Sequence, residues 1–188
     1  NGYGDNVEAL KQKFGIDQGI IRNSDVKEIM DALRMHLAKD EEYQYLVGLS
    51  FPEEERQKKY FAEIAEKLRE RYGKNKILYC HYHEDEFYRV GASSFIKELY
   101  EKHCLLDVVC DCSSYDTHRW CKYEAEGIHT VMESNKDRVL FVHVGEGHCQ
   151  MCNVENDMYI DGEKVDVGYT VNQIISRLKK LEEVVHEG

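Results

Sequence analysis

Three short apolar runs in the second half of the chain have the composition of buried strands. Each is too short for a typical helix of a globular protein and is rich in branched, aromatic or cysteine side chains. Runs as apolar as these are typical of strands covered on both faces, as in a parallel sheet. The three runs are 76–82 (KILYCHY), 105–110 (LLDVVC) and 138–144 (RVLFVHV).

Amphipathic stretches separate the apolar runs. Residues 93–103 and 120–133 have the apolar spacing of helices, although Gly127 interrupts the second. A closing helix is expected from Thr170 or Asn172. This alternation predicts an α/β fold, with a parallel sheet flanked by helices in right-handed crossovers. We expect the three strands to lie side by side, with the second strand beside the first.

The first part of the chain carries helix and loop signals instead. Asp25 followed by Glu28 resembles a capping box, and Pro52 can open a second helix at its first turn. We therefore expect a helical lead-in over residues 1–73 and the α/β domain over 74–188.

Composition and charge exclude several classes of function. Of 188 residues, 42% are hydrophobic and 32% charged, as in a folded protein, and the formal net charge is −11. No dense basic run is present, so nucleic acid and anionic lipid are not expected as partners. No apolar run is long enough to span a membrane. Because the chain begins at Asn1 without methionine, we expect it to be part of a longer protein.

The cysteines indicate a reducing compartment. There are seven, an odd number, and several lie in or beside the expected strands, where free cysteine behaves as a small hydrophobic residue. We therefore expect a cytoplasmic location, which could be the cytoplasmic part of a membrane receptor.

His148, Cys149 and Cys152 form a CxxC motif with an adjacent histidine. Two thiolates could bind zinc or form a redox pair. An ordinary loop with two free cysteines is the main interpretation, and zinc is the alternative. A zinc site wants four ligands, and further ones could come from His143, Cys110 and Cys112 only if the fold brings them close.

Three segments of the second half together resemble a known family. They are similar to the SEFIR domain, the Toll/interleukin-1-receptor-like module of interleukin-17 receptors and their adaptor. The likeness lies in a first strand with its acidic loop, a helix and strand ending in Asp111, and a helix with an early tryptophan before a third strand. Its fourth strand has two weak candidates, 158–160 and 164–167. The three segments are 76–85 (KILYCHYHED), 92–111 (ASSFIKELYEKHCLLDVVCD) and 119–144 (RWCKYEAEGIHTVMESNKDRVLFVHV).

The resemblance implies intracellular signalling through association with another SEFIR-like domain, in a receptor, an adaptor or a second copy of this chain. The contact surface should come from the loops after the first two expected strands, since ligands and partners meet parallel sheets at the carboxyl ends of strands. The residues expected there are Tyr82, Glu84, Asp85, Phe87, Tyr115, Arg119, Trp120 and Lys122.

The alternative that the resemblance implies is an enzyme. Some Toll/interleukin-1-receptor-like domains cleave NAD with a helical glutamate near a tryptophan or cysteine, and Glu124 after Trp120 is the matching candidate. A solvent-facing Glu124 is the default interpretation, and no glycine-rich nucleotide loop is present. We therefore expect no catalysis and no cofactor. A zinc-stabilised binding module is a third alternative.

Overall fold

A five-stranded parallel sheet in the order β2-β1-β3-β4-β5 forms the centre of the protein. The computed structural model describes residues 43–187, which include all five strands. This architecture confirms the expected α/β fold, and the strand order is that of flavodoxin-like proteins. The strands are β1 (Tyr45–Ser50), β2 (Ile77–Leu78), β3 (Cys104–Asp111), β4 (Val139–His143) and β5 (Tyr159–Asp161).

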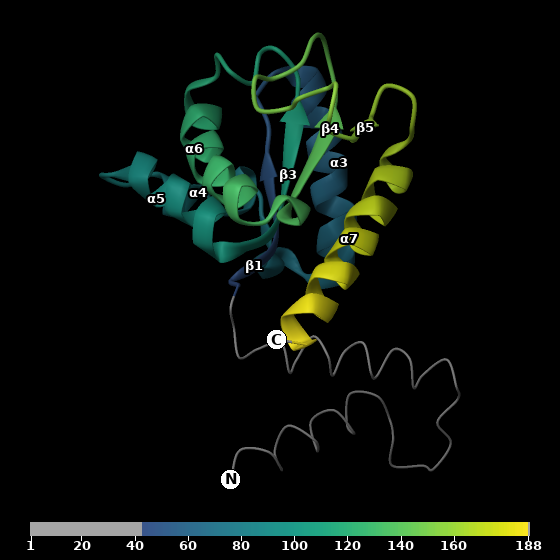
Figure 1. Cartoon of the computed structure of the whole chain (residues 1–188). Helices are drawn as coiled ribbons and strands as arrows, with labels where there is room; N and C mark the ends of the chain where they lie inside the picture. Colours follow the sequence, from purple (N-terminus) through teal and green to yellow (C-terminus); the bar gives the residue numbers. More distant parts are fainter. Residues whose placement is uncertain (1–42, 188) are drawn as a thin grey trace, which may run out of the picture. The chain divides into compact units, whose positions relative to one another are not determined.

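Helices cover both faces of the sheet. In Figure 1, α3 (Glu55–Tyr72) and α7 (Val167–Glu187) lie on one side, and α5 (Ala92–Glu98) and α6 (Arg119–Ser134) lie on the other. None of the helices within residues 43–187 has the length and apolar character to cross a membrane. Shorter helical segments are η2 (Lys74–Lys76), η3 (Cys80–Tyr82), α4 (Glu84–Phe87), η4 (Leu99–His103) and η5 (Lys136–Arg138).

The central strand β1 is not expected from the sequence analysis. It lies between β2 and β3, so the strands expected at 76–82 and 105–110 share one parallel sheet but are not neighbours. Residues 43–73 therefore contribute a strand and a helix to the compact unit with the sheet, instead of a helical lead-in. The expected capping box at Asp25 lies outside the described residues.

Gly48 explains how β1 fits at the centre. A Cβ atom at this position would lie 2.8 Å from the Sγ of Cys104 and 2.9 Å from the Oδ1 of Asp107. Only glycine permits β3 to approach this closely. The same glycine weakens the strand signal in the sequence, which otherwise reads as a continuous apolar run (YLVGLS).

The other elements differ from expectation mainly at their ends. The run 76–82 gives only the two residues of β2, because the chain then turns into η3. The weak candidate 158–160 corresponds to β5, whereas 164–167 forms no strand and leads into α7. Gly127 does not interrupt α6, which continues through it. A Cβ atom at Gly127 would lie 2.3 Å from the backbone oxygen of Lys97 in α5, so glycine permits the two helices to pack closely.

Candidate functional site

Three buried polar side chains meet where β1 ends beside α6. Ser50, the last residue of β1, donates a hydrogen bond of 2.5 Å to Glu124 Oε2 on α6. Its hydroxyl also lies 2.6 Å from the phenol oxygen of Tyr115. Because Ser50 has one proton and gives it to the carboxylate, Tyr115 donates the second bond. The arrangement is a chain of hydrogen bonds that ends on Glu124.

Glu124 has an unusual electrostatic environment for a carboxyl group. Burial raises its pKa from 4.5 to about 7, and the negative charge of Glu53 acts in the same direction, while the hydrogen bond from Ser50 lowers it. Burial likewise raises the pKa of Tyr115, so that its phenol keeps its proton at neutral pH. Glu124 can therefore change its protonation state near physiological pH, as groups at functional sites often do.

A pocket of about 540 Å³ opens beside Glu124. Such a volume suits a small-molecule ligand. Its walls combine the aromatic rings of Phe51, Phe87 and Trp120 with a few polar groups. The pocket forms beyond the carboxyl ends of β1 and β2, the usual ligand position in an open parallel sheet.

His81 joins two acidic residues at the rim of this pocket. Its Nε2 lies 3.2 Å from Glu53 Oε1, and its Nδ1 lies 3.2 Å from Glu84 Oε1. Cys80 donates a weak hydrogen bond of 3.6 Å to the same Glu53 oxygen. Burial raises the pKa of the Cys80 thiol, so it is no ready nucleophile. Glu124 is therefore the group in this pocket best suited to chemistry.

The expected contact residues fall into different environments. Glu84, Phe87 and Trp120 line the pocket, so the structure brings together side chains from two of the expected loops. Tyr115 is only 1% exposed, however, and cannot touch a partner; burial against Ser50 and Glu124 explains this correction. The default of a solvent-facing Glu124 is also wrong, because this side chain is buried.

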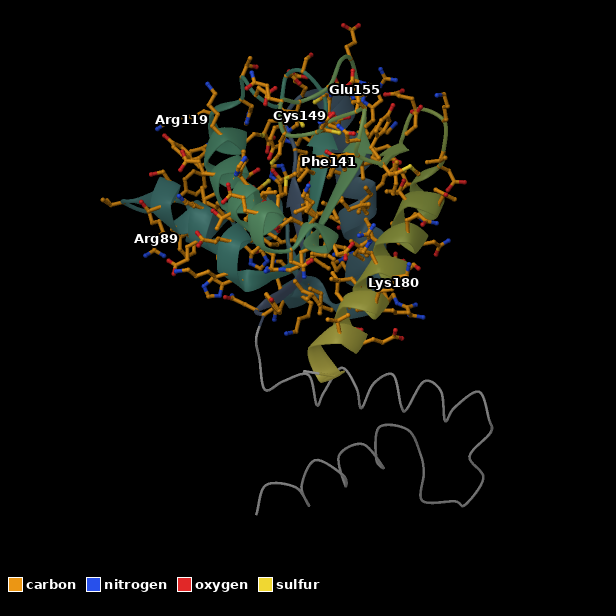
Figure 2. All side chains as sticks on the ribbon, in the orientation of Figure 1. Arg89, Arg119, Phe141, Cys149, Glu155 and Lys180 are labelled. Atoms are coloured by element: carbon orange, nitrogen blue, oxygen red, sulfur yellow. The ribbon has the colours of Figure 1, made fainter. Side chains whose placement is uncertain are left out.

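The remaining contact residues lie away from the pocket. Tyr82 donates a hydrogen bond of 2.5 Å to Glu66 on α3. Arg119 and Lys122 are exposed, and Arg119 points outward from the start of α6 with its guanidinium 5.1 Å from the Trp120 ring (Figure 2). The side chain of Asp85 lies outside what the structure describes.

The CxxC cysteines are buried near the carboxyl ends of β3 and β4, where Figure 2 labels Cys149. Burial raises the pKa of both thiols to about 12, which disfavours a reactive thiolate at either position. His148 instead pairs with Asp111, through an Nδ1–Oδ2 distance of 2.5 Å. Among the described residues, the alternative zinc set of Cys149, Cys152 and His148 does not form a group with ligand spacing, whereas His148 does so with Asp111 and His143.

Ser50 was missed in the sequence analysis and Tyr115 was given a different role, whereas a signal for the burial of Glu124 was present in the sequence. Cys121, Glu124, Ile128 and Val131 repeat at helical spacing and share the buried stripe of α6. A carboxylate inside an apolar stripe is a signature of a buried ionisable group. Ser50 and the role of Tyr115 had no such signal, because β1 was not recognised.

Comparison of the chain with protein-family models gives no match, and comparison with curated proteins gives none either.

Proposed function

We propose that the Glu124 pocket cleaves the N-glycosidic bond between nicotinamide and ribose in NAD. The observation that carries the proposal is the buried carboxyl group of Glu124, which lines an aromatic pocket and accepts a hydrogen bond from Ser50. The resemblance to Toll/interleukin-1-receptor-like domains suggests the substrate, since some members cleave NAD with a helical glutamate near a tryptophan or cysteine, as Glu124 is near Trp120 and Cys121 in the sequence.

The chemistry suits a site with one buried carboxylate. The nicotinamide of NAD carries a positive charge, so it leaves as a neutral molecule and requires no proton from a general acid. As its bond to ribose C1′ breaks, the electron pair stays on the nicotinamide nitrogen and positive charge develops on the ribose. The Glu124 carboxylate can stabilise that charge. Water then bonds to C1′ and releases a proton, and the products are nicotinamide and ADP-ribose.

The walls of the pocket support a flat, partly apolar ligand. Phe87 and Trp120 line the pocket and can contact a flat ring, and Arg89, which also lines it, provides a cation for a phosphate. The guanidinium of Arg89 lies 4.3 Å from the centre of the Phe95 ring, and this cation–π contact helps to position the Arg89 side chain.

Release of nicotinamide from NAD by the purified full chain tests the proposal. We expect Glu124→Gln, which keeps the size of the side chain, to lower the rate by about 100-fold or more. Glu126→Gln on the exposed side of the same helix is the matched control and should keep the rate. Equal melting temperatures of the variants would exclude unfolding. The proposal is wrong if the parent protein releases no nicotinamide, or if Glu124→Gln releases it at the parent rate.

A second candidate function is the association with another SEFIR-like domain in intracellular signalling. One observation favours it: Trp120 is 40% exposed beside the exposed Arg119, and exposed aromatic and arginine side chains are frequent anchors of protein interfaces. All seven cysteines are free, which supports a reducing, cytoplasmic location for either function. Signalling modules of this kind could also carry an active pocket, so both functions could reside in one domain.

A further inference from the structure

A second group of polar side chains gathers at the ends of β3 and β4, on residues that the Glu124 pocket does not use. Asp111 ends β3 and His143 ends β4, and the two are direct partners in the register of the sheet. The loop after β4 then returns His148 to the same point, so that its Nδ1 lies 2.5 Å from Asp111 Oδ2. We call these three residues the Asp111 cluster.

Asp111 is the buried centre of the cluster, with no exposed surface. Its Oδ1 accepts a hydrogen bond of 2.8 Å from the backbone nitrogen of Cys149, and its Oδ2 faces both imidazoles. A buried carboxylate is costly unless hydrogen bonds or positive charge compensate it. These contacts therefore hold the Asp111 carboxyl group at a fixed position between two imidazoles.

The distances within the cluster are close to those of a metal site. Donor atoms bound to zinc at about 2.0–2.2 Å in a tetrahedron lie about 3.3–3.6 Å from one another. Asp111 Oδ2 lies 3.6 Å from His143 Nδ1 and 2.5 Å from His148 Nδ1, and donor atoms of all three residues lie within 4.8 Å of one another. To bind an ion, His148 must move away from Asp111 by about 1 Å, and His143 Nδ1 must release its hydrogen bond to the Asp111 backbone oxygen.

The surroundings of His148 permit it to move, whereas those of His143 hold its ring in place in the absence of an ion. The side chain of His148 is 35% exposed, so it can rotate and an ion can reach it from solvent. His143 is largely covered, and its Nδ1 lies 2.9 Å from the backbone oxygen of Asp111. Metal binding would replace this hydrogen bond. The Tyr159 ring packs at 5.8 Å from His143 and 5.4 Å from His148, closing one side of the cluster.

The donor types select the class of ion. Two imidazoles and one carboxylate suit zinc and similar divalent transition metals, whereas magnesium and calcium prefer sets of oxygen ligands. Three protein ligands also leave a position for water. We propose that Asp111, His143 and His148 bind a divalent transition metal of the zinc class, which fastens the loop over residues 144–158 to the end of the sheet.

Titration of the chelator-treated full chain with Zn²⁺ tests the site. We expect one equivalent to bind and the melting temperature to rise, because an ion that binds only the folded state stabilises it. Mg²⁺ should do neither. His143→Ala and His148→Ala should each weaken Zn²⁺ binding by about 100-fold or more, since even partners of metal ligands contribute 10–100-fold.

Three control variants distinguish this site from others. His129→Ala removes an exposed histidine on α6. His81→Ala disrupts a second group with ligand spacing, formed by Glu53, Cys80 and His81. Cys149→Ser combined with Cys152→Ser removes the thiols of the CxxC motif. All of these should keep one equivalent of Zn²⁺. The bound Co²⁺ spectrum should lack thiolate charge-transfer bands.

Three results would each overturn the proposal. They are the absence of stoichiometric Zn²⁺ or Co²⁺ binding by the parent, unchanged binding in a folded variant that lacks both His143 and His148, and loss of binding in the His81 or cysteine variants alone. If the histidine variants do not fold, thiolate bands in the Co²⁺ spectrum of the parent protein still decide against the site, and their absence with one bound equivalent supports it.

Discussion

At the scale of single residues, the hydrogen bond from Ser50 lowers the pKa of Glu124 against the larger effect of burial. Burial holds the pKa of Glu124 at about 7, and the hydrogen bond from Ser50 keeps it from rising further. The carboxylate must be ionised to stabilise positive charge, so NAD cleavage should increase with pH through about 7. Ser50→Ala removes the only described donor to Glu124 and should move this limb of the pH–rate profile to higher pH. Ser114→Ala, whose hydroxyl bonds to Glu54, should leave it in place. A limb that stays or moves to lower pH in Ser50→Ala would contradict this assignment.

Asp107 is a second buried carboxyl group, and it affects stability. It is fully buried on β3, where among the described residues only the weak donor Cys104 and the charge of Arg138 favour its ionised form. Burial raises its pKa well above 3.8 in the folded protein, against the opposing charge of Arg138. The unfolded chain therefore loses this proton first, and the folded state loses stability as the pH rises above about 3.8 toward the raised folded pKa.

Asp107→Asn removes this titration, so its effect on the free energy of unfolding should change with pH in a predictable direction. The free energy of unfolding of Asp107→Asn, relative to the parent, should increase as the pH is raised from 3 to 7 in urea unfolding experiments, by about 1 kcal/mol or more. Asp137→Asn, at an exposed position paired with Arg177, is the control and should show no such increase. A difference between Asp107→Asn and the parent that is constant with pH would show that Asp107 is not a buried neutral acid.

At the scale of elements, the contact between α5 and α6 depends on Gly127. Alanine at an exposed helix position usually stabilises by about 1 kcal/mol relative to glycine. Here the new Cβ atom would lie 2.3 Å from the backbone oxygen of Lys97, so the helices must separate. Gly127→Ala should therefore lower the free energy of unfolding by about 1–3 kcal/mol. Thr130→Ala, exposed on the same helix, should change it by less than about 0.5 kcal/mol. A more stable Gly127→Ala would mean that the helices are not this close.

The elements also show what the sequence could and could not predict. Strands β3 and β4 were predictable, because buried parallel strands are apolar on both faces and need no partner to be recognised. β1 was not, since Gly48 lowers its strand signal and the reason for Gly48 is a contact with Cys104 and Asp107 far along the chain. The candidate site was likewise predictable only in part. Glu124 could be named from its sequence motif, but its hydrogen bond to Ser50 could not be predicted without recognising β1.

At the scale of the whole molecule, the two groups of polar residues occupy different parts of one edge. The Glu124 pocket lies beyond β1 and β2, and the Asp111 cluster lies beyond β3 and β4. They share none of their residues, so the loss of one function need not affect the other. A third feature, the exposed Trp120, lines the pocket and is also the anchor of the proposed association.

Association through Trp120 can be tested apart from stability, and the buried Glu124 allows it to be tested apart from the proposed catalysis. Sedimentation of the full chain at increasing concentration would detect binding of a second copy of the chain. We expect Trp120→Ala to weaken self-association by about 30-fold, as loss of an interface anchor does, while the melting temperature stays constant. Tyr169→Ala, at an exposed aromatic residue on α7 across the sheet, is the matched control. Glu124→Gln should leave association unchanged because this side chain is buried.

With a formal net charge of −11, two copies repel each other at long range, so added salt should strengthen binding. A chain that stays monomeric at its highest soluble concentration, with or without salt, would rule out a second copy as the partner.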